Sequence, residues 1–188
     1  MGSVKRALRI IAKATGPETW ARIREERTQD LLVYLALAKF GGRPPLSKLP
    51  RSLRLDIRGL LSTYKKACAQ ADALLFSAGN RQMVDEACRA SQVGKLTPSV
   101  LYIRQAALES LAPVLRIYEG CARVVVGSVE GANIIKLDRD APVVSYLQYH
   151  QFEDDPHPAL QGPPSGRSDK RQGEIPGLLG VGESANPS

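Results

Sequence analysis

Apolar residues recur three and four positions apart through residues 1–92, the spacing that gathers side chains on one face of a helix. Caps, prolines and glycines divide this stretch, because such residues begin or end helices. Thr28 and Asn80 are predicted to be N-caps, and Trp20 and Ile23 are predicted to point inward. The predicted helices are Val4–Ala14, a helix from Pro17, Asp30–Phe40, Ser52–Ala71 and Arg81–Ala90. We interpret residues 1–92 as one all-helical unit.

Short β-branched and aromatic runs replace the helical pattern after Gly94, and such runs are typical of strands. The predicted strands are Val100–Ile103, Ile134–Leu137 and Val143–Tyr149, and Glu109–Val126 is predicted to be a helix between the first two. The last two strands flank the five residues Asp138–Pro142, so they predict a β-hairpin. We interpret residues 93–160 as a small α+β unit.

Residues 161–188 are rich in Gly, Pro and Ser and contain no aromatic residue. Such a composition buries too little apolar surface to offset the entropy lost on ordering, so it predicts a disordered tail. The predicted fold class is therefore α+β, with a helical N-terminal unit, a small α+β unit that contains a β-hairpin, and a disordered C-terminal tail.

Charge is distributed unevenly along the chain, whose formal net charge is +7. Residues 1–66 contain 15 Lys and Arg against 5 Asp and Glu, whereas residues 67–188 contain 11 against 14. A basic half joined to a mildly acidic half favours DNA as a partner, and a solvated helical surface is the alternative. The predicted DNA-binding residues are Lys5, Arg6, Arg9, Lys13, Arg54, Arg58, Lys65, Lys66, Asn133 and Lys136.

Two helices carry most of these predicted DNA-binding residues. Lys5, Arg9 and Lys13 recur every four residues, so they form one stripe of the first helix. Packing of that helix through Leu8 and Ile11 against the apolar face of Ser52–Ala71 would join the two basic faces into one surface. Asn133 and Lys136 are included because they flank the start of a strand, within reach of a phosphate or a base edge.

Features of a secreted or membrane protein are not evident in this sequence. No run approaches the roughly 18 apolar residues that a membrane helix needs, and charged residues interrupt the N-terminal segment where a signal peptide would be apolar. The three cysteines are widely spaced, which favours reduced thiols over disulfides or a zinc site. We expect a cytoplasmic protein with no membrane partner.

Several runs in the second half resemble one bacterial family, the DNA phosphorothioation-associated methyltransferase-like proteins. The runs are Tyr118-Glu119-Gly120-Cys121-Ala122-Arg123, Glu130-Gly131-Ala132-Asn133-Ile134-Ile135-Lys136-Leu137, Ser145-Tyr146-Leu147 and Asp155-Pro156-His157-Pro158-Ala159-Leu160. The resemblance covers nearly all of residues 3–160. It implies that the domain binding S-adenosylmethionine would lie before Met1, so that this chain is a truncated, C-terminal portion of a relative. No cofactor is expected in this portion, and its role as an enzyme stays open.

Three groups of residues are candidates for a chemical site. Val124–Gly131 has only two glycines and is a poor methyl-donor loop. Glu153–His157, with His150 nearby, combines carboxylates and imidazoles that bind metals, and a solvated turn is the alternative. Tyr118, Glu119, Arg123, Glu130, Asn133 and Lys136 form the third group, in which Glu119 and Arg123 have the spacing of an ion pair within a helix. Structural pairing and ligand contact both remain open for this group.

Two segments depart from the pattern expected of the family. Tyr102–Leu108 lacks the His and Ser expected there, and Asp138 stands where a His is expected after Lys136-Leu137. We therefore expect a non-catalytic, DNA-binding portion of a phosphorothioation-associated methyltransferase-like protein. The alternative is a protein-interaction module, in which Asp30–Phe40 docks a separately encoded methyltransferase domain or other DNA-modification proteins.

Overall fold

The computed structural model describes residues 6, 10–11, 14–127, 129–148 and 171–174. It divides into two compact units, Met1–Asp72 (unit 1) and Ala73–Ser188 (unit 2). The boundary precedes the predicted one at residue 92, since the helix that follows Asn80 packs within unit 2. The fold class is α+β, as predicted. Within the described ranges, no helix has both the length and the apolar character needed to cross a membrane.

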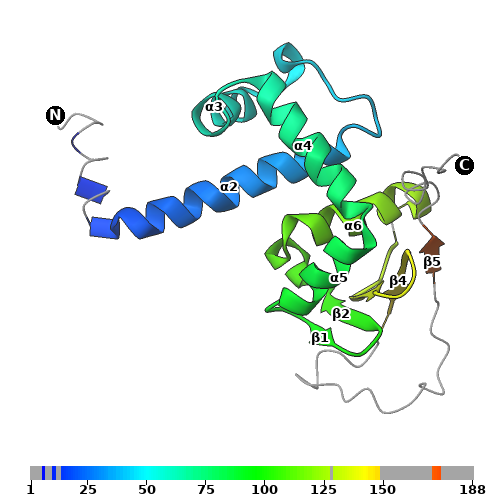
Figure 1. The fold of residues 1–188 in the computed structure, drawn as a ribbon. Coiled ribbons are helices and arrows are strands. Elements are labelled where there is room, and N and C mark those ends of the chain that lie inside the picture. The colour runs from blue at the N-terminus through cyan, green and yellow to red at the C-terminus, as the bar shows by residue number, and fades with distance from the viewer. Residues whose placement is uncertain (1–5, 7–9, 12–13, 128, 149–170, 175–188) are drawn as a thin grey trace, which may run out of the picture. The chain divides into compact units, whose positions relative to one another are not determined.

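Unit 1 is built from α2 (Pro17–Leu37), the short 3-10 helix η1 (Leu46–Lys48), α3 (Arg51–Leu60) and the start of α4 (Tyr64–Ala78) (Figure 1). The prediction of two helices between Pro17 and Phe40 was wrong, because α2 runs without a break past Thr28. The Thr28 hydroxyl donates to the carbonyl oxygen of Arg24 over 2.7 Å, the bond that a threonine inside a helix makes to the preceding turn.

The buried residues of α2 all lie in its second half. Leu31, Val33, Leu35 and Ala36 are buried, whereas the first half of the helix extends away from α3 (Figure 1). Trp20 and Ile23, which were predicted to point inward, are 40% and 39% exposed. That prediction was wrong because helical spacing identifies an apolar stripe without showing where along its length another element packs on it. The core of the unit is completed by Leu49, Ile57, Leu61, Ala67 and Ala71.

The predicted helix Ser52–Ala71 is in fact two helices. Leu61–Thr63 separate α3 from α4, and Ser62 adopts a left-handed conformation with φ 67°, which few residues other than glycine adopt. The Thr63 hydroxyl then accepts the backbone N–H of Lys66 over 3.2 Å, so it caps the new helix. The apolar run Leu74–Phe76, which follows the predicted end at Ala71, also belongs to α4.

Unit 2 combines helices with one antiparallel sheet. Its elements are the end of α4, α5 (Arg81–Ala90), β1 (Lys95–Leu96), β2 (Val100–Arg104), η2 (Gln105–Ser110), α6 (Pro113–Val126), β3 (Ile134–Asp138), β4 (Val143–Leu147) and β5 (Arg171–Glu174). The sheet order is β1-β2-β3-β4-β5. The predicted hairpin is confirmed, with Leu137 opposite Val144. The predicted helix Glu109–Val126 begins only at Pro113, after the 3-10 turn η2.

β5 was not predicted, because it lies within the range 161–188 that was expected to be a disordered tail. Its four residues pair with β4, and backbone hydrogen bonding of this kind does not need apolar side chains. The rest of that range, together with Tyr149 and most of the predicted helix Val4–Ala14, lies outside the described residues.

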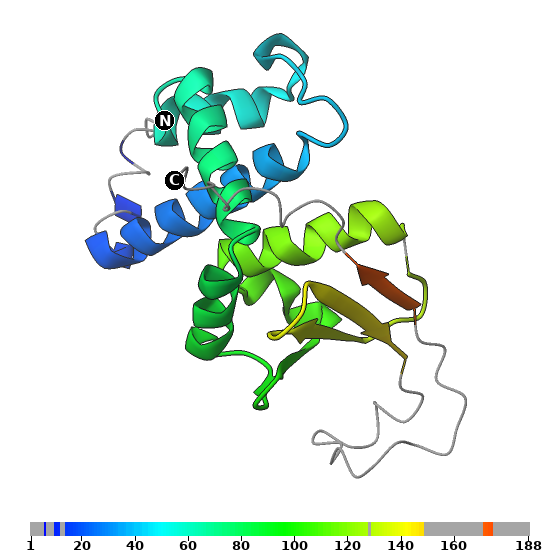
Figure 2. The same ribbon diagram turned by 45° about the vertical axis from the view of Figure 1, so that its right-hand side comes forward.

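One face of the sheet and α6 form the core of unit 2 (Figure 2). Alternate strand residues point to this face, and they are almost fully buried: Leu101, Ile103, Ile135, Leu137, Val144 and Tyr146. Leu115, Ile117 and Ala122 of α6 are buried as well. At the sheet edge, Gly94 has φ 92°, and a Cβ there would overlap the Tyr102 carbonyl oxygen.

The Asn80 side chain caps α5, as predicted. Its Oδ1 accepts the backbone N–H groups of Gln82 at 3.0 Å and Met83 at 3.3 Å. We expect Asn80→Ala to lower the free energy of unfolding by about 1 kcal/mol, since it leaves these donors without a protein acceptor. Urea denaturation would measure the change, and Asn80→Asp, which keeps the acceptor, should stay within about 0.5 kcal/mol of the native protein. A fully stable alanine variant would show that the cap is unimportant.

Candidate nucleic-acid interface

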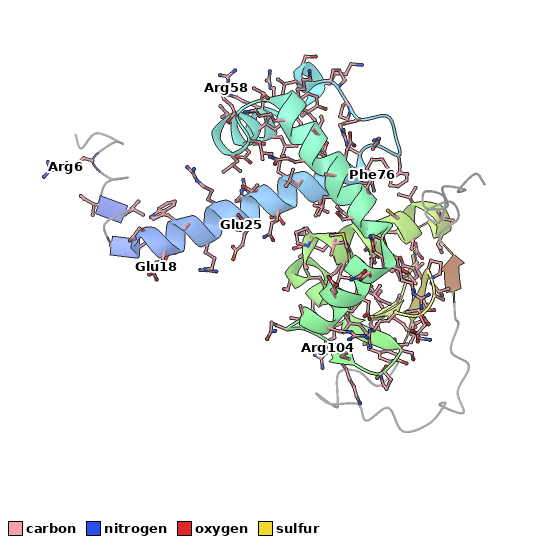
Figure 3. The ribbon with its side chains drawn as sticks, in the orientation of Figure 1. Arg6, Glu18, Glu25, Arg58, Phe76 and Arg104 are labelled. Atoms are coloured by element: carbon pink, nitrogen blue, oxygen red, sulfur yellow. The ribbon has the colours of Figure 1, made fainter. Side chains whose placement is uncertain are left out.

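Three arginines share the solvent-facing side of α3. Arg51, Arg54 and Arg58 are three and four positions apart and exposed, while Ile57 of the same helix is only 2% exposed. This spacing places the three guanidinium groups along one helix face, and Arg58 extends outward from α3 in Figure 3. The sequence thus folds α3 into a helix with one buried apolar side and one cationic side.

Four other basic residues of unit 1 have carboxylate partners. Arg22 pairs with Glu26, Arg27 with Asp56, and both Lys39 and Arg43 with Asp72. The Asp72 carboxylate receives Arg43 at 2.8 Å and Lys39 at 2.9 Å, and these two hydrogen bonds hold the pKa of that carboxyl below its usual range. By contrast, the described part of the chain holds no ion-pair partner for Arg51, Arg54 or Arg58.

Two lysines occupy the first turn of α4. Lys65 and Lys66 are exposed and follow Tyr64, where the helix begins. A helix favours anions near its N-terminus and cations near its C-terminus, so both lysines, like Arg51 at the first position of α3, oppose the local field. A phosphate bound beside them would offset this cost. We name Arg51, Arg54, Arg58, Lys65 and Lys66 the α3–α4 basic surface.

Four of the predicted DNA-binding residues lie in two consecutive helices of unit 1. Arg54 and Arg58 are in α3, and Lys65 and Lys66 are in the first turn of α4. Arg51 was not in the predicted set. Its position three residues before Arg54 and seven before Arg58 places it on the same helix face, and this spacing could have identified it from the sequence. Leu55, also exposed at 56%, adds an apolar side chain to the same side of α3.

The basic N-terminal segment is described only in part. Arg6 is exposed, and Lys5, Arg9 and Lys13 lie outside the described residues. Ile11, through which this segment was predicted to pack, is 47% exposed. Its predicted partner Leu8 is outside the described residues. Ile57, the central residue of the opposing predicted face, is buried within unit 1 instead.

Asn133 and Lys136 lie in unit 2. Lys136 is in β3, opposite Tyr102 of β2 and Ser145 of β4. Asn133 precedes β3, and its backbone N–H donates to the Leu147 carbonyl over 3.0 Å while its own carbonyl accepts from Gln105. The backbone of Asn133 therefore extends the ladder by which β3 joins its neighbours.

The family-like motif of α6 forms a buried hydrogen-bond network. Oε1 of Glu119, a residue 1% exposed, accepts Nη2 of Arg123 at 2.6 Å, Nε of Arg123 at 3.0 Å and the Tyr146 hydroxyl at 3.0 Å. The predicted Glu119–Arg123 ion pair is thus confirmed. Burial, and then the Glu119 carboxylate, raise the pKa of Tyr146. This network joins α6 to β4, so Glu119, Arg123 and Tyr146 all have a structural role.

The remaining polar positions of the motif differ in their surroundings. Tyr118 is buried, burial raises its pKa to about 12, and its hydroxyl donates to the Ala141 carbonyl over 3.4 Å. Glu130 is exposed. Asp138, which replaces the expected His, accepts the backbone N–H groups of Asp140 and Ala141, each over 2.9 Å. Asp138 therefore shapes the hairpin turn.

The candidate donor loop does not follow a strand. Val124–Val126 are the last residues of α6, and Gly127 beyond them has φ 81°. A methyl-donor loop of the usual kind follows a strand and precedes a helix. Val124–Gly131 instead runs from the end of the helix α6 and precedes the strand β3.

The described residues hold no group of three or more His, Cys, Asp or Glu placed to bind a metal, and the predicted segment with His150 and Glu153–His157 lies outside them. The three cysteines are free thiols. Burial raises the pKa of Cys88 and of Cys121 to about 11, which keeps both protonated at neutral pH and poorly nucleophilic.

Comparisons of this chain with protein-family models, with curated proteins and with solved structures found no match.

Proposed function

We propose that this chain binds duplex DNA through the α3–α4 basic surface, as the non-catalytic portion of a DNA phosphorothioation-associated methyltransferase-like protein. The observation that supports DNA binding is the uncompensated charge of that surface, in a unit where four other basic residues have carboxylate partners. The wider assignment rests on the sequence motifs of Tyr118–Leu147. Phosphates are the groups that such a surface attracts, and they position a protein without reading base sequence.

The salt dependence of duplex binding tests this proposal. Changing Arg51, Arg54 and Arg58 together to Gln should weaken binding to every duplex and lower the slope of log affinity against log salt by about 0.9 for each phosphate that is no longer neutralised. Fluorescence anisotropy with a labelled duplex, measured over a series of salt concentrations, gives both quantities. Circular dichroism would establish that the variant keeps its helices.

A matched variant removes the same charge elsewhere. Arg22, Arg81 and Arg89 are exposed and pair with Glu26, Asp140 and Asp85. Their joint replacement by Gln should change the salt slope little, because each already has an acidic neighbour. An equal reduction of the slope in both triple variants would mean that only net charge matters, and an unchanged slope in the α3 variant would refute the proposed surface.

A paired measurement addresses the modification itself. Affinity for a duplex with phosphorothioate linkages is compared with affinity for the same duplex with ordinary phosphates. Tighter binding to the modified duplex would support the family assignment. Equal binding would leave DNA binding intact and remove any role in sensing sulfur.

The second candidate is a protein-interaction module that docks a methyltransferase domain. The segment first expected to dock, Asp30–Phe40, buries Leu31, Val33 and Leu35 in its own unit. The exposed Trp20 and Ile23 on the first half of α2 favour that half as the docking site instead. Weak duplex binding with a shallow salt slope in the native protein would favour this candidate over DNA binding.

A further inference from the structure

The sheet of unit 2 has a second face, opposite the one that α6 covers. Residues paired across antiparallel strands point to the same face, so the register defines a row across it. Lys95 lies opposite Tyr102, Tyr102 opposite Lys136, and Lys136 opposite Ser145. Tyr102 therefore has a lysine as its cross-strand neighbour on each side.

The two lysines of this row carry uncompensated charge. Lys95 is exposed and Lys136 half-buried, and neither has an ion-pair partner among the described residues. Asp138 lies two residues after Lys136 in β3 and therefore on the same face of the sheet. Its Oδ1 accepts two backbone N–H groups of the hairpin turn. Lysine is disfavoured in strands, so the row does not follow from strand propensity.

The accessible part of this face lies over β1, β2 and β3. Tyr102 and Ile134 are half-buried and Arg104 is exposed (Figure 3), whereas Ser145 and Leu147 of β4 are 9% and 7% exposed. Among the described residues, Tyr146 and Tyr118, the other aromatic residues near the sheet, belong to the core. Tyr102 is thus an aromatic side chain at an accessible position, between two ammonium groups.

We propose that Lys95, Tyr102 and Lys136 form a binding site for single-stranded nucleic acid, in which the Tyr102 ring stacks on a base and the lysines contact the flanking phosphates. Aromatic rings flanked by positive charge bind single strands in this way with little sequence preference, because every base has a π-face. The site is in unit 2, whereas the α3–α4 basic surface is in unit 1, so it extends the proposed function to a second form of nucleic acid and does not depend on it.

The ring is tested with two substitutions of Tyr102. Tyr102→Leu keeps an apolar side chain but removes the ring, and should weaken binding to a fluorescein-labelled oligothymidylate of about twelve nucleotides by roughly tenfold, the effect expected for one stacked base. Tyr102→Phe keeps the ring and should bind like the native protein. Anisotropy titrations give the affinities. Native-like binding by the leucine variant, or equal weakening in both variants, would overturn the stacking role.

The lysines and a control variant complete the test. Lys95→Gln and Lys136→Gln should each lower the salt slope for the single strand by about 0.7, the value for one phosphate that is no longer neutralised. Tyr34→Leu makes the matched change at an exposed tyrosine of α2 and should leave binding unchanged. Weakening by Tyr34→Leu as large as that by Tyr102→Leu would overturn the assignment to this face.

The two proposals fail in different ways. If the native protein binds the duplex but not the oligothymidylate, the single-strand site is wrong and the proposed function stands. If it binds the oligothymidylate through Tyr102 but not the duplex, the α3–α4 basic surface is wrong and the single-strand site stands. Failure of the native protein to bind either nucleic acid would refute both.

Discussion

Replacing Glu119 with alanine should lower the free energy of unfolding by about 3 kcal/mol, one of the two largest effects expected from a single substitution here. The change removes the acceptor of three hydrogen bonds and leaves the buried Tyr146 hydroxyl without its partner. A stranded buried hydroxyl costs about 1–3 kcal/mol, and the loss of a charged hydrogen bond adds to this. Arg123 moderates the effect because its side chain is 45% exposed and water can solvate it.

Chemical denaturation of three variants measures the network. Tyr146→Phe removes the hydroxyl and should lower the free energy of unfolding less than Glu119→Ala does. The double variant should be less destabilised than the sum of the two single variants, since no buried hydroxyl is then left without a partner. Glu26→Ala removes an exposed carboxylate of an ion pair with the same i, i+4 spacing and should cost under about 1 kcal/mol. An equal loss of stability in Glu119→Ala and Glu26→Ala would contradict the importance of burial.

The second large effect is expected from Arg139→Ala, which should also lower the free energy of unfolding by about 3 kcal/mol. The Arg139 side chain is only 8% exposed. Its Nε and Nη2 contact Oδ1 of Asp85 at 2.6 and 2.5 Å, and its Nη1 donates to the carbonyls of Thr97 at 3.0 Å and Pro98 at 2.6 Å. One guanidinium thus joins α5, the β1–β2 turn and the β3–β4 loop.

Arg89 provides the control, because it contacts the other oxygen of the same carboxylate. Its Nε lies 2.9 Å from Oδ2 of Asp85, but its side chain is 66% exposed. Arg89→Ala should therefore change stability by less than about 1 kcal/mol. Thermal or urea unfolding of the two variants gives the comparison, and similar destabilisation would show that the carbonyl hydrogen bonds of Arg139 contribute little.

Local signals in the sequence predicted local features well. The Asn80 cap, the Glu119–Arg123 pair and the hairpin about Asp138–Pro142 each depend on residues within a few positions of one another. The α3–α4 break was missed because Ser62 takes a left-handed conformation that its residue type disfavours. The length of α2 was missed because Thr28 resembles a cap, yet nothing between Glu18 and Leu37 is a proline or glycine that would end a helix.

Features that depend on distant segments were less predictable. The exposure of Trp20 and Ile23 depends on how far α3 extends along α2, which no pattern within α2 encodes. β5 pairs with β4 through backbone groups, so its side chains gave no strand signal. For the candidate sites, charge spacing predicted Arg54 and Arg58, but the row of Lys95, Tyr102 and Lys136 appears only when the register of three strands is known.

Gly94 has a consequence for how variation in this chain should be interpreted. With its left-handed φ and no room for a Cβ beside the Tyr102 carbonyl, this position should accept only glycine in any library screened for folded protein. Such intolerance would report closure of the β1–β2 edge rather than recognition of a ligand. Neighbouring Lys95, whose side chain is exposed, should vary freely in that screen and become restricted only when selection is for binding.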